Sequence, residues 1–350
     1  MNNIIRSLRK DYTLTQEAVI LAKIFCMPRV FIVMSVYTQL NLEQVHTFAM
    51  QYGLEIIEIE PIQGGIENTN YFITAKNGQE FVLTVFEELD LNAAAELFPV
   101  LQHLEQHGIP VAVPLTFQDQ PIHSIVGKPA QIAPRIAGKH PMPSTVAQVG
   151  AMGEALAKMH LALQNYPLQR KNNHDHAWWS STAHTLYAKM NEADQALLTQ
   201  VFAQYEQMFD AYPNRPYGLI HADLFRDNSL YVGDSLSGIL DFSELSYDQL
   251  LLDISITMND FCSDYPNVSL DVEKAQAFLN AYQTIRTLTD DEKSCLQSYL
   301  AMAACRFWIS RLQVAERNHN EGRTGTEILQ KDPQEMRNMT HDRLNTEYVF

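Results

Sequence analysis

The chain has 350 residues, of which 46% are hydrophobic and 19% are charged, a composition typical of a folded chain large enough for two domains. Lys and Arg number 25 and Asp and Glu number 41, so the formal net charge is −16. This negative charge disfavours nucleic acid and anionic membranes as partners, because both present dense phosphate groups. The 4 cysteines form no C-x-x-C pair, which favours reduced thiols, a cytoplasmic location and no zinc site.

The first 33 residues differ in charge from the rest of the chain, since 5 of them are basic and 2 are acidic. Their apolar stretch 18–33 is interrupted by Lys23, Pro28 and Arg29, and its 16 residues fall short of a bilayer span. No small-residue cleavage site of the kind that ends a signal peptide follows it. We therefore expect Met34 to be the physiological start and residues 1–33 to be an extension outside the fold.

Residues 34–137 have the pattern of a small β-rich lobe. After a helix capped by Asn41, alternating apolar and polar residues predict a set of strands, at 54–60, 70–74, 80–86, 111–118 and 129–136. The dipeptide Asn77-Gly78 predicts a tight turn between the second and third strands. A helix is expected over 92–107, ended by Gly108. The lobe is thus predicted to be a five-stranded antiparallel sheet with one inserted helix.

Helical periodicity dominates residues 138–350, with helices expected at 144–163, 182–211, 249–262, 271–286 and 289–317. Two short apolar segments, 230–232 and 238–240, predict one hairpin around Gly233-Asp234. From about Asn318 the chain is polar and is expected to form a loop and a packing tail. The fold class is therefore α+β, with a small antiparallel β lobe, a larger helical lobe and a ligand cleft between them.

The most specific motif is the octapeptide His221-Ala222-Asp223-Leu224-Phe225-Arg226-Asp227-Asn228, followed by Asp241-Phe242. It fits H-x-D-x-x-x-x-N and D-F, the catalytic and metal-binding loops of the kinase superfamily. Phosphoryl transfer needs a carboxylate that orients the acceptor hydroxyl and an oxygen cluster that holds Mg²⁺ on the nucleotide phosphates. We predict Asp223 as the base and Asn228 and Asp241 as the metal ligands. We expect His221 to form structural hydrogen bonds in the loop.

Gly64 and Gly65 lie between the first two predicted strands, where a kinase-like fold places its phosphate-covering loop. The segment is not G-x-G-x-x-G, and a plain hairpin turn is the alternative. Two glycines nevertheless let backbone N–H groups approach phosphate, and Asn68 and Thr69 add side-chain donors. We predict these four residues as nucleotide-binding.

The usual phosphate-binding lysine of kinases is missing. Thr84 occupies its place on the third strand, so Glu96 on the following helix lacks its usual partner. Phe225 likewise stands two residues after Asp223, where protein kinases often carry a lysine. The candidate replacement cations are Arg226, which we place with Asp223 in the catalytic site, and Lys76 and Lys128.

The later helices carry candidate substrate-binding residues. Asp253, in an apolar helix, needs hydrogen bonds to be tolerated and is expected to brace the backbone of the catalytic loop. Asp260, near the end of that helix, is the candidate partner of a substrate ammonium, with a capping or exposed carboxylate as the alternative. Arg306 and Arg311 lie on different faces of a further apolar helix. We predict that one binds a substrate carboxylate, with an internal ion pair as the alternative.

On these motifs the sequence resembles the aminoglycoside phosphotransferase-like branch of the kinase superfamily and, within it, the bacterial homoserine kinases. The resemblance covers Met34 to the end and rests on segments 65–72, 81–84, 127–130, 221–228, 253–260 and 306–312. A threonine at position 84 also resembles this subfamily. The family transfers the γ-phosphoryl group of ATP to the hydroxyl of L-homoserine, giving O-phospho-L-homoserine for threonine synthesis. The resemblance therefore implies ATP as co-substrate, Mg²⁺ and a small-molecule acceptor.

The expected mechanism is in-line transfer driven by positioning and charge neutralisation. We expect the adenine to lie near the segment that connects the lobes, at Ala133 and Arg135. One alternative is a kinase of the same fold for an aminoglycoside, choline or hydroxylysine. Another is a pseudokinase without catalytic activity, suggested by Thr84 and disfavoured by the complete catalytic motif. The sequence leaves the oligomeric state open.

Overall fold

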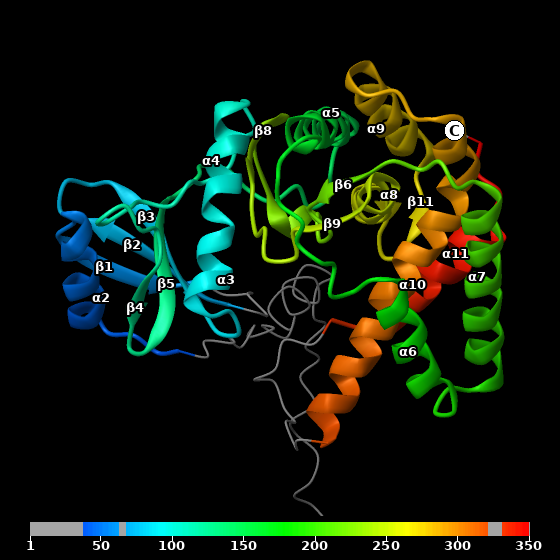
Figure 1. Ribbon diagram of the computed structural model, residues 1–350, viewed down its shortest axis with the longest axis horizontal. Coiled ribbons are helices and arrows are strands. Elements are labelled where there is room, and N and C mark those ends of the chain that lie inside the picture. Colours follow the sequence, from blue (N-terminus) through cyan, green and yellow to red (C-terminus); the bar gives the residue numbers. More distant parts are fainter. Residues whose placement is uncertain (1–37, 63–67, 321–330, 350) are drawn as a thin grey trace, which may run out of the picture.

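The structure is a computed structural model that describes residues 38–62, 68–320 and 331–349. The predicted extension 1–33 and the predicted phosphate-binding residues Gly64 and Gly65 lie outside the described residues. The described chain forms a β-rich lobe and a larger helical lobe, which lie on opposite sides of the view in Figure 1. This is the α+β, kinase-like arrangement that the order of strands and helices predicts.

The first lobe is one antiparallel sheet of five strands in the order β1-β2-β3-β5-β4. Its strands are β1 (Ile56–Pro61), β2 (Asn68–Ala75), β3 (Glu80–Phe86), β4 (His123–Ile125) and β5 (Lys128–Pro134). Gly78 has a φ of 84° in the turn between β2 and β3, which confirms the turn predicted there. Alternate residues of β2 are buried against a small core that the helix α2 (Leu42–Ala49) and the short 3₁₀ helix η1 (Met50–Tyr52) help to cover.

The predicted strand at 111–118 is wrong. Its segment makes isolated contacts instead of a ladder: a bridge from Val111 to Ile239, one hydrogen bond from the N–H of Leu115 to the carbonyl oxygen of Ile132 in β5, and a tight turn around Gln118. The short β4 completes the sheet instead. Pro110 and Pro114 explain the difference, because proline has no N–H group to donate to a strand ladder.

The helix predicted at 92–107 is two helices, α3 (Leu91–Glu96) and α4 (Phe98–Gln106), because Pro99 interrupts the helical hydrogen bonds. Gly108 follows α4 with a φ of 74°. The buried face of α4 belongs to the core of the helical lobe, and His103 Nε2 donates to the carbonyl oxygen of Ala162 at 2.8 Å. In Figure 1 this helix stands between the sheet and the helical lobe.

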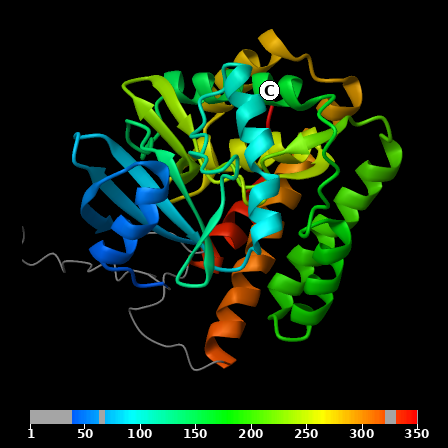
Figure 2. The same cartoon turned by 60° about the vertical axis from the view of Figure 1, so that its left-hand side comes forward.

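The helical lobe consists mainly of long helices, namely α5 (Val146–Leu163), α6 (His176–Tyr187), α7 (Glu192–Ala211), α8 (Leu250–Phe261), α9 (Val272–Ile285), α10 (Asp290–Asn320) and α11 (Pro333–Asn345). Every residue of α8 is buried. The helix α10 packs against α6, α7, α8 and α11 and runs the length of the lobe, as Figure 2 also shows. No helix in the described residues is long and apolar enough to cross a membrane.

Three two-stranded sheets lie among these helices. They pair β6 (Tyr217–Ile220) with β9 (Ser246–Gln249), β7 (Ser229–Val232) with β8 (Ser235–Ile239), and β10 (Ser263–Asp264) with β11 (Ser269–Leu270). The pair β7 and β8 confirms the predicted hairpin. The four-residue strand β6, which leads into the catalytic motif, was not predicted.

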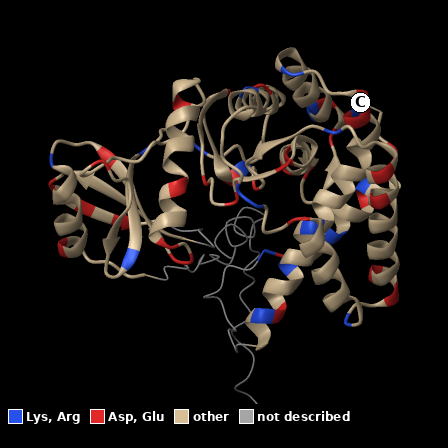
Figure 3. Ribbon diagram, viewed as in Figure 1, with Lys and Arg blue, Asp and Glu red and all other residues tan. Residues whose placement is uncertain are grey.

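One helical prediction is corrected here by the structure. The helix expected at 182–211 is divided into α6 and α7, because Asn191 caps a new helix by accepting the N–H of Asp194. The expected packing tail is confirmed and is helical, since α11 packs along α10 and buries Met336, Met339, Thr340 and Arg343. Acidic and basic residues are spread over both lobes (Figure 3).

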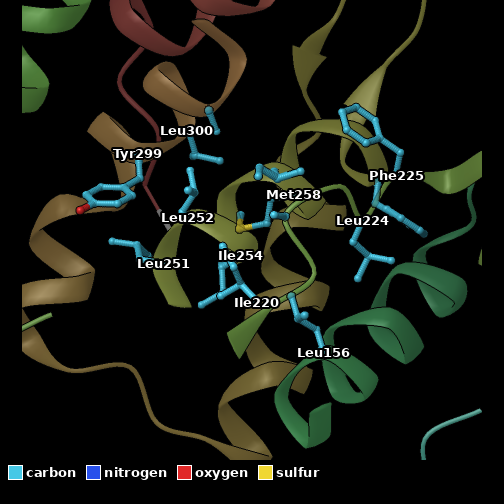
Figure 4. Packing of buried hydrophobic residues seen from close by; sticks show 14 of the residues in the cluster. Leu156, Ile220, Leu224, Phe225, Leu251, Leu252, Ile254, Met258, Tyr299 and Leu300 are labelled. Carbon is cyan, nitrogen blue, oxygen red and sulfur yellow. The ribbon is translucent and has the colours of Figure 1, made fainter. Parts of the chain in front are cut away.

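The core of the helical lobe reaches into the catalytic motif. Leu224 and Phe225 are buried in the same cluster as Leu156 of α5 and Ile254 and Met258 of α8, as Figure 4 shows. These two large apolar residues thus anchor the motif, and the polar residues on either side of them are held at the edge of a packed interior.

The contact between α5 and α9 gives a stability prediction. A Cβ atom at Gly153 would lie 2.4 Å from the carbonyl oxygen of Phe278, whereas one at Gly150 would lie 3.9 Å from its nearest neighbour. We expect Gly153→Ala to lower the free energy of unfolding by about 1–3 kcal/mol, because the two helices must separate. Gly150→Ala, the matched control, should raise it by up to about 1 kcal/mol through helix propensity. Urea unfolding measures both, and equal effects would contradict the close packing.

Candidate active site

A buried carboxylate holds the start of the catalytic loop. Asp253 on α8 is fully buried, and its two oxygens accept the backbone N–H groups of His221 and Ala222, each at 2.9 Å. His160 of α5 donates from Nε2 to the same carboxylate at 3.1 Å. Ala222 is thereby held in a left-handed conformation with a φ of 65°. The prediction that Asp253 braces the catalytic loop is confirmed.

His221 connects the catalytic loop to the metal loop. Its Nε2 donates to the carbonyl oxygen of Leu240 at 2.9 Å, and its Nδ1 accepts the N–H of Asp223 at 3.4 Å. The ring is buried and lies against Phe242, with 4.7 Å between the ring centroids. This agrees with the expected structural role of His221, since both of its nitrogens are engaged by backbone groups.

The two ends of the motif meet in space. Asn228 donates from Nδ2 to the carbonyl oxygen of Asp223 at 2.8 Å and to its carboxylate at 3.1 Å. A short 3₁₀ helix, η2 (Arg226–Asn228), makes the turn that brings these side chains together. Because the amide nitrogen of Asn228 is turned toward Asp223, its Oδ1 is on the opposite side, and such an oxygen is the kind of ligand that Mg²⁺ prefers.

The metal loop lies beside this pair. The N–H of Leu240 donates to the carbonyl oxygen of Asn228 at 2.9 Å, which places Asp241 next to the catalytic loop. Asp241 is exposed, has a φ of 56°, and accepts the hydroxyl of Ser243 at 2.6 Å. Within residues 38–62, 68–320 and 331–349 there is no cluster of three or more His, Cys, Asp or Glu side chains that could hold a metal alone.

Two predicted site residues bind each other. Asp260 accepts the backbone N–H of Arg226 at 2.7 Å and its Nε at 2.9 Å, and the hydroxyl of Tyr265 donates to the same carboxylate at 3.0 Å. The guanidinium also lies over the Tyr265 ring, 4.2 Å from its centroid. Burial opposes the charge of Arg226, but Asp260 outweighs it and raises the pKa of the guanidinium.

The two arginines of α10 face different partners. Arg306 is buried, with Nη2 at 3.4 Å from Glu244 of the metal loop, and Glu244 also accepts Nδ1 of His174 at 2.7 Å. Burial would raise the pKa of Glu244, but His174 and Arg306 together lower it. Arg311 instead donates from Nη1 to the carbonyl oxygen of Asp332 and to Glu335 of α11, at 2.8 and 2.9 Å.

A cavity of about 290 Å³ opens beside the catalytic loop. Its walls include the loop itself, the Asp260–Arg226 pair and Arg311, and on the other side three residues at the start of α11, Lys331, Asp332 and Glu335. Arg306 is not among the described residues that line it. Sequence reasoning missed the α11 side, because nothing in a polar tail indicates which distant segment it will contact.

In the β lobe, the candidate cations have acidic partners. Lys128 forms an ion pair with Glu87, and the buried hydroxyl of Thr69 donates to the same carboxylate at 2.5 Å. Lys76 pairs with Glu55 at 2.6 Å on the exposed hairpin. Glu96, which lacks its usual kinase partner, lies 3.8 Å from Nε of Arg170, and Arg170 donates to the carbonyl oxygen of Ser243 in the metal loop at 2.7 Å.

The remaining nucleotide-site candidates lie on strands. Thr84 donates to Asn70 at 2.8 Å between β3 and β2. Asn68 starts β2 opposite Phe86, and Ala133 of β5 is opposite Val82. Arg135 lies over the ring of Phe72, 3.8 Å from its centroid, and pairs with Glu80 at 2.8 Å. The side chains of Thr84 and Arg135 therefore have partners within the β lobe.

The fold and the joined loops define a kinase-like phosphotransferase, and known proteins agree. Residues 58–288 match the phosphotransferase enzyme family. The homoserine kinase of Janthinobacterium sp. (strain Marseille) is 36% identical over 284 residues, which cover 80% of this chain and 88% of that protein. The homoserine kinase of Cupriavidus metallidurans is 37% identical over 294 residues, covering 80% of this chain and 89% of its own.

A solved structure supports the fold. An amicoumacin kinase, in complex with AMP-PNP and Ca²⁺, has a TM-score of 0.60 at 16% identity and covers 94% of this chain and 93% of its own. The chain belongs to the phosphotransferase enzyme family and, within it, to the homoserine kinases.

The Asp253 contacts give a pH prediction. Burial would raise the pKa of this carboxyl, but its hydrogen bonds with His160 and with the backbone of His221 outweigh burial and hold the pKa below its ordinary value of 3.8. The unfolded chain therefore takes up this proton first as the pH falls. The stability that Asp253 contributes is present above about pH 4 and is lost as the pH falls through the lowered pKa.

We expect Asp253→Asn to flatten this acid loss and to lower the free energy of unfolding at pH 7 by about 3–5 kcal/mol, since the buried network loses its charge. Urea unfolding between pH 7 and about pH 3 measures both effects. Asp210→Asn, at an exposed position of α7, is the matched control and should change neither. An unchanged acid dependence in Asp253→Asn would show that Asp253 is not the group that titrates.

Proposed function

We propose that the protein transfers the γ-phosphoryl group of ATP to the side-chain hydroxyl of L-homoserine, giving O-phospho-L-homoserine for L-threonine biosynthesis. The observation that carries the proposal is that the catalytic loop and the metal loop are joined by hydrogen bonds. Asn228 donates to the Asp223 carboxylate, and the carbonyl oxygen of Asn228 accepts the N–H of Leu240, the residue before Asp241. Membership of the homoserine kinases supports this acceptor.

In this reaction Asp223 orients the acceptor hydroxyl and takes its proton. The hydroxyl oxygen bonds to the γ-phosphorus, the bond from that phosphorus to the bridging oxygen breaks, and ADP leaves with the electron pair. Asp253 and His221 contribute by holding the loop, so that the base is placed before the substrate arrives. We assign Arg226 to positioning, because its bonds to Asp260 fix the turn between Asp223 and Asn228.

The residues present fit a Mg²⁺ ion carried on ATP. Asn228 and Asp241 offer hard oxygen ligands on adjacent segments, and a site with few protein ligands is typical of Mg²⁺, which takes its remaining ligands from phosphate and water. When bound, Mg²⁺ neutralises charge on the phosphates. We propose that Asn228 and Asp241 hold it.

We propose that the phosphates of ATP bind at Gly64, Gly65, Asn68 and Thr69, and that its adenine binds at Ala133 and Arg135. The side chains of Thr69 and Arg135 are engaged within the sheet, so contacts from these two residues fall to the backbone.

The acceptor site is the cavity beside the catalytic loop. Its walls carry both signs of charge, with Arg311 and Lys331 against Asp260, Asp332 and Glu335. A lining of mixed charge suits a zwitterionic acceptor such as an amino acid. A mainly acidic lining would instead favour binding of a polycationic aminoglycoside. We propose Arg311 for the carboxylate and Asp260 for the ammonium group. Arg306 then acts from outside the cavity, by holding Glu244 of the metal loop.

The direct experiment is an ADP-release assay with Mg·ATP and a panel of acceptors, namely L-homoserine, choline, hydroxylysine and an aminoglycoside. We expect turnover with L-homoserine well above the others. Preferred turnover of the aminoglycoside would replace the proposed acceptor, and no turnover with any acceptor would favour a pseudokinase.

Two variants test the assigned roles. We expect Asp223→Ala to lower kcat by ~10²–10⁴-fold, the range for loss of a general base, with nucleotide affinity nearly unchanged. Asp241→Ala should instead raise the Kd of Mg·ATP, because a metal ligand is lost. Steady-state kinetics and calorimetric titration separate the two effects, with Asp210→Ala as the control. Full activity in Asp223→Ala would show that another group is the base.

A further inference from the structure

The C-terminal segment brings a cation to the catalytic loop. Phe225 stands two residues after Asp223, at a position where protein kinases often carry a lysine. In the folded chain, Nζ of Lys331 lies over the Phe225 ring, 5.3 Å from its centroid. It is also 2.9 Å from Oδ2 of Asp227 in the same loop. A residue more than 100 positions away in the chain thus stands beside the loop position that lacks a charge.

Lys331 faces the place where the reaction would occur. It lines the cavity beside the loop, and its electrostatic neighbours include the carboxylate of Asp223. Burial opposes its charge, but Asp227 and Asp223 together raise the pKa of the Lys331 ammonium, even with Arg311 acting against it. The side chain therefore carries its positive charge toward the base throughout the neutral pH range.

The packing of α11 explains how Lys331 is positioned. Asp332 caps α11 by accepting the N–H of Gln334, and Arg311 on α10 donates to the Asp332 carbonyl oxygen and to Glu335. The backbone next to Lys331 is therefore fixed to the helical core. Its own pair with Asp227 is about 40% exposed on both sides, and pairs of this kind contribute little to stability. A contribution to folding stability is therefore a weak explanation for the presence of a lysine at position 331.

The other candidate cations are committed elsewhere. Arg226 uses both its backbone N–H and its Nε on Asp260. Lys128 is paired with Glu87 and Lys76 with Glu55, both within the β lobe. Among the four, Lys331 combines a partner in the catalytic loop, a place in the cavity wall and proximity to the base.

We propose that Lys331 replaces the missing lysine of the catalytic loop and binds the γ-phosphoryl oxygens during transfer. The inference rests on the proposed kinase function. As the acceptor oxygen bonds to the γ-phosphorus and the bond to the ADP oxygen breaks, the ammonium group neutralises charge on the transferring group, while the hydroxyl proton passes to Asp223. A cation of this kind acts mainly on the transition state and so on kcat.

The test compares Lys331→Met, which keeps an unbranched side chain of nearly the same length without its charge, with Lys331→Arg and with Lys189→Met. Lys189 forms an exposed pair with Glu316 and is the matched control. We expect Lys331→Met to lower kcat for L-homoserine by ~10²-fold, with a change in KM below about threefold. Lys331→Arg should recover part of the loss. Equal urea midpoints for all chains would show that folding is not the cause.

A second readout separates the phosphoryl group from the substrate carboxylate. ATP hydrolysis measured without acceptor involves no substrate carboxylate, and we expect Lys331→Met to lower its rate as well. A raised KM for L-homoserine with kcat and ATP hydrolysis unchanged would overturn the proposal, because Lys331 would then bind the substrate. Unchanged kinetics would overturn it too.

The outcome also distinguishes this inference from the proposed function. Wild-type protein that does not phosphorylate L-homoserine would overturn the proposed acceptor. The same variants would then be compared on the acceptor that the panel identifies, or on ATP hydrolysis alone, where an unchanged rate in Lys331→Met would overturn the role of Lys331.

Discussion

A single buried carboxylate determines the geometry of the site. Asp253 lies in the centre of the helical lobe, where an ionised group costs several kcal/mol unless its hydrogen bonds are satisfied. Three donors satisfy it, the N–H groups of His221 and Ala222 and Nε2 of His160. Nδ1 of His160 in turn forms a hydrogen bond with the hydroxyl of Tyr282, at 2.7 Å, which holds the imidazole ring in place beside Asp253. The catalytic loop is thereby joined to α5, α8 and α9.

The other functional groups are placed through this attachment. Ala222 adopts a left-handed conformation that a loop held less firmly would rarely keep. The ring of His221 donates to the carbonyl oxygen of Leu240, and the N–H of Leu240 donates to the carbonyl oxygen of Asn228. These hydrogen bonds to the backbone position the base and both proposed metal ligands. Leu224 and Phe225 add apolar anchors beneath the loop. The loop is thus held by hydrogen bonds and packing within the chain itself, which suits transfer by positioning.

Much of this was predictable from the sequence, and the failures have physical causes. The octapeptide at 221–228 predicts the catalytic loop. A carboxylate inside an apolar helix must find donors, so the role of Asp253 followed from its environment alone. The strand expected at 111–118 failed because two prolines remove ladder donors. The bond between Arg226 and Asp260 and the place of Lys331 depend on contacts between segments far apart in the chain, and no local pattern encodes such contacts.

Amide hydrogen exchange in the unmodified protein tests the central interaction most directly. The N–H groups of His221 and Ala222 should exchange as slowly as those in the middle of α8, because opening them requires the buried carboxylate of Asp253 to lose two of its donors. The protection factors of both amides, which compare the observed rate with the intrinsic rate at the same pH, should fall in the acid range in which Asp253 takes up a proton. Fast exchange of both amides at neutral pH, at the rate of an exposed loop, would show that Asp253 does not hold the catalytic loop.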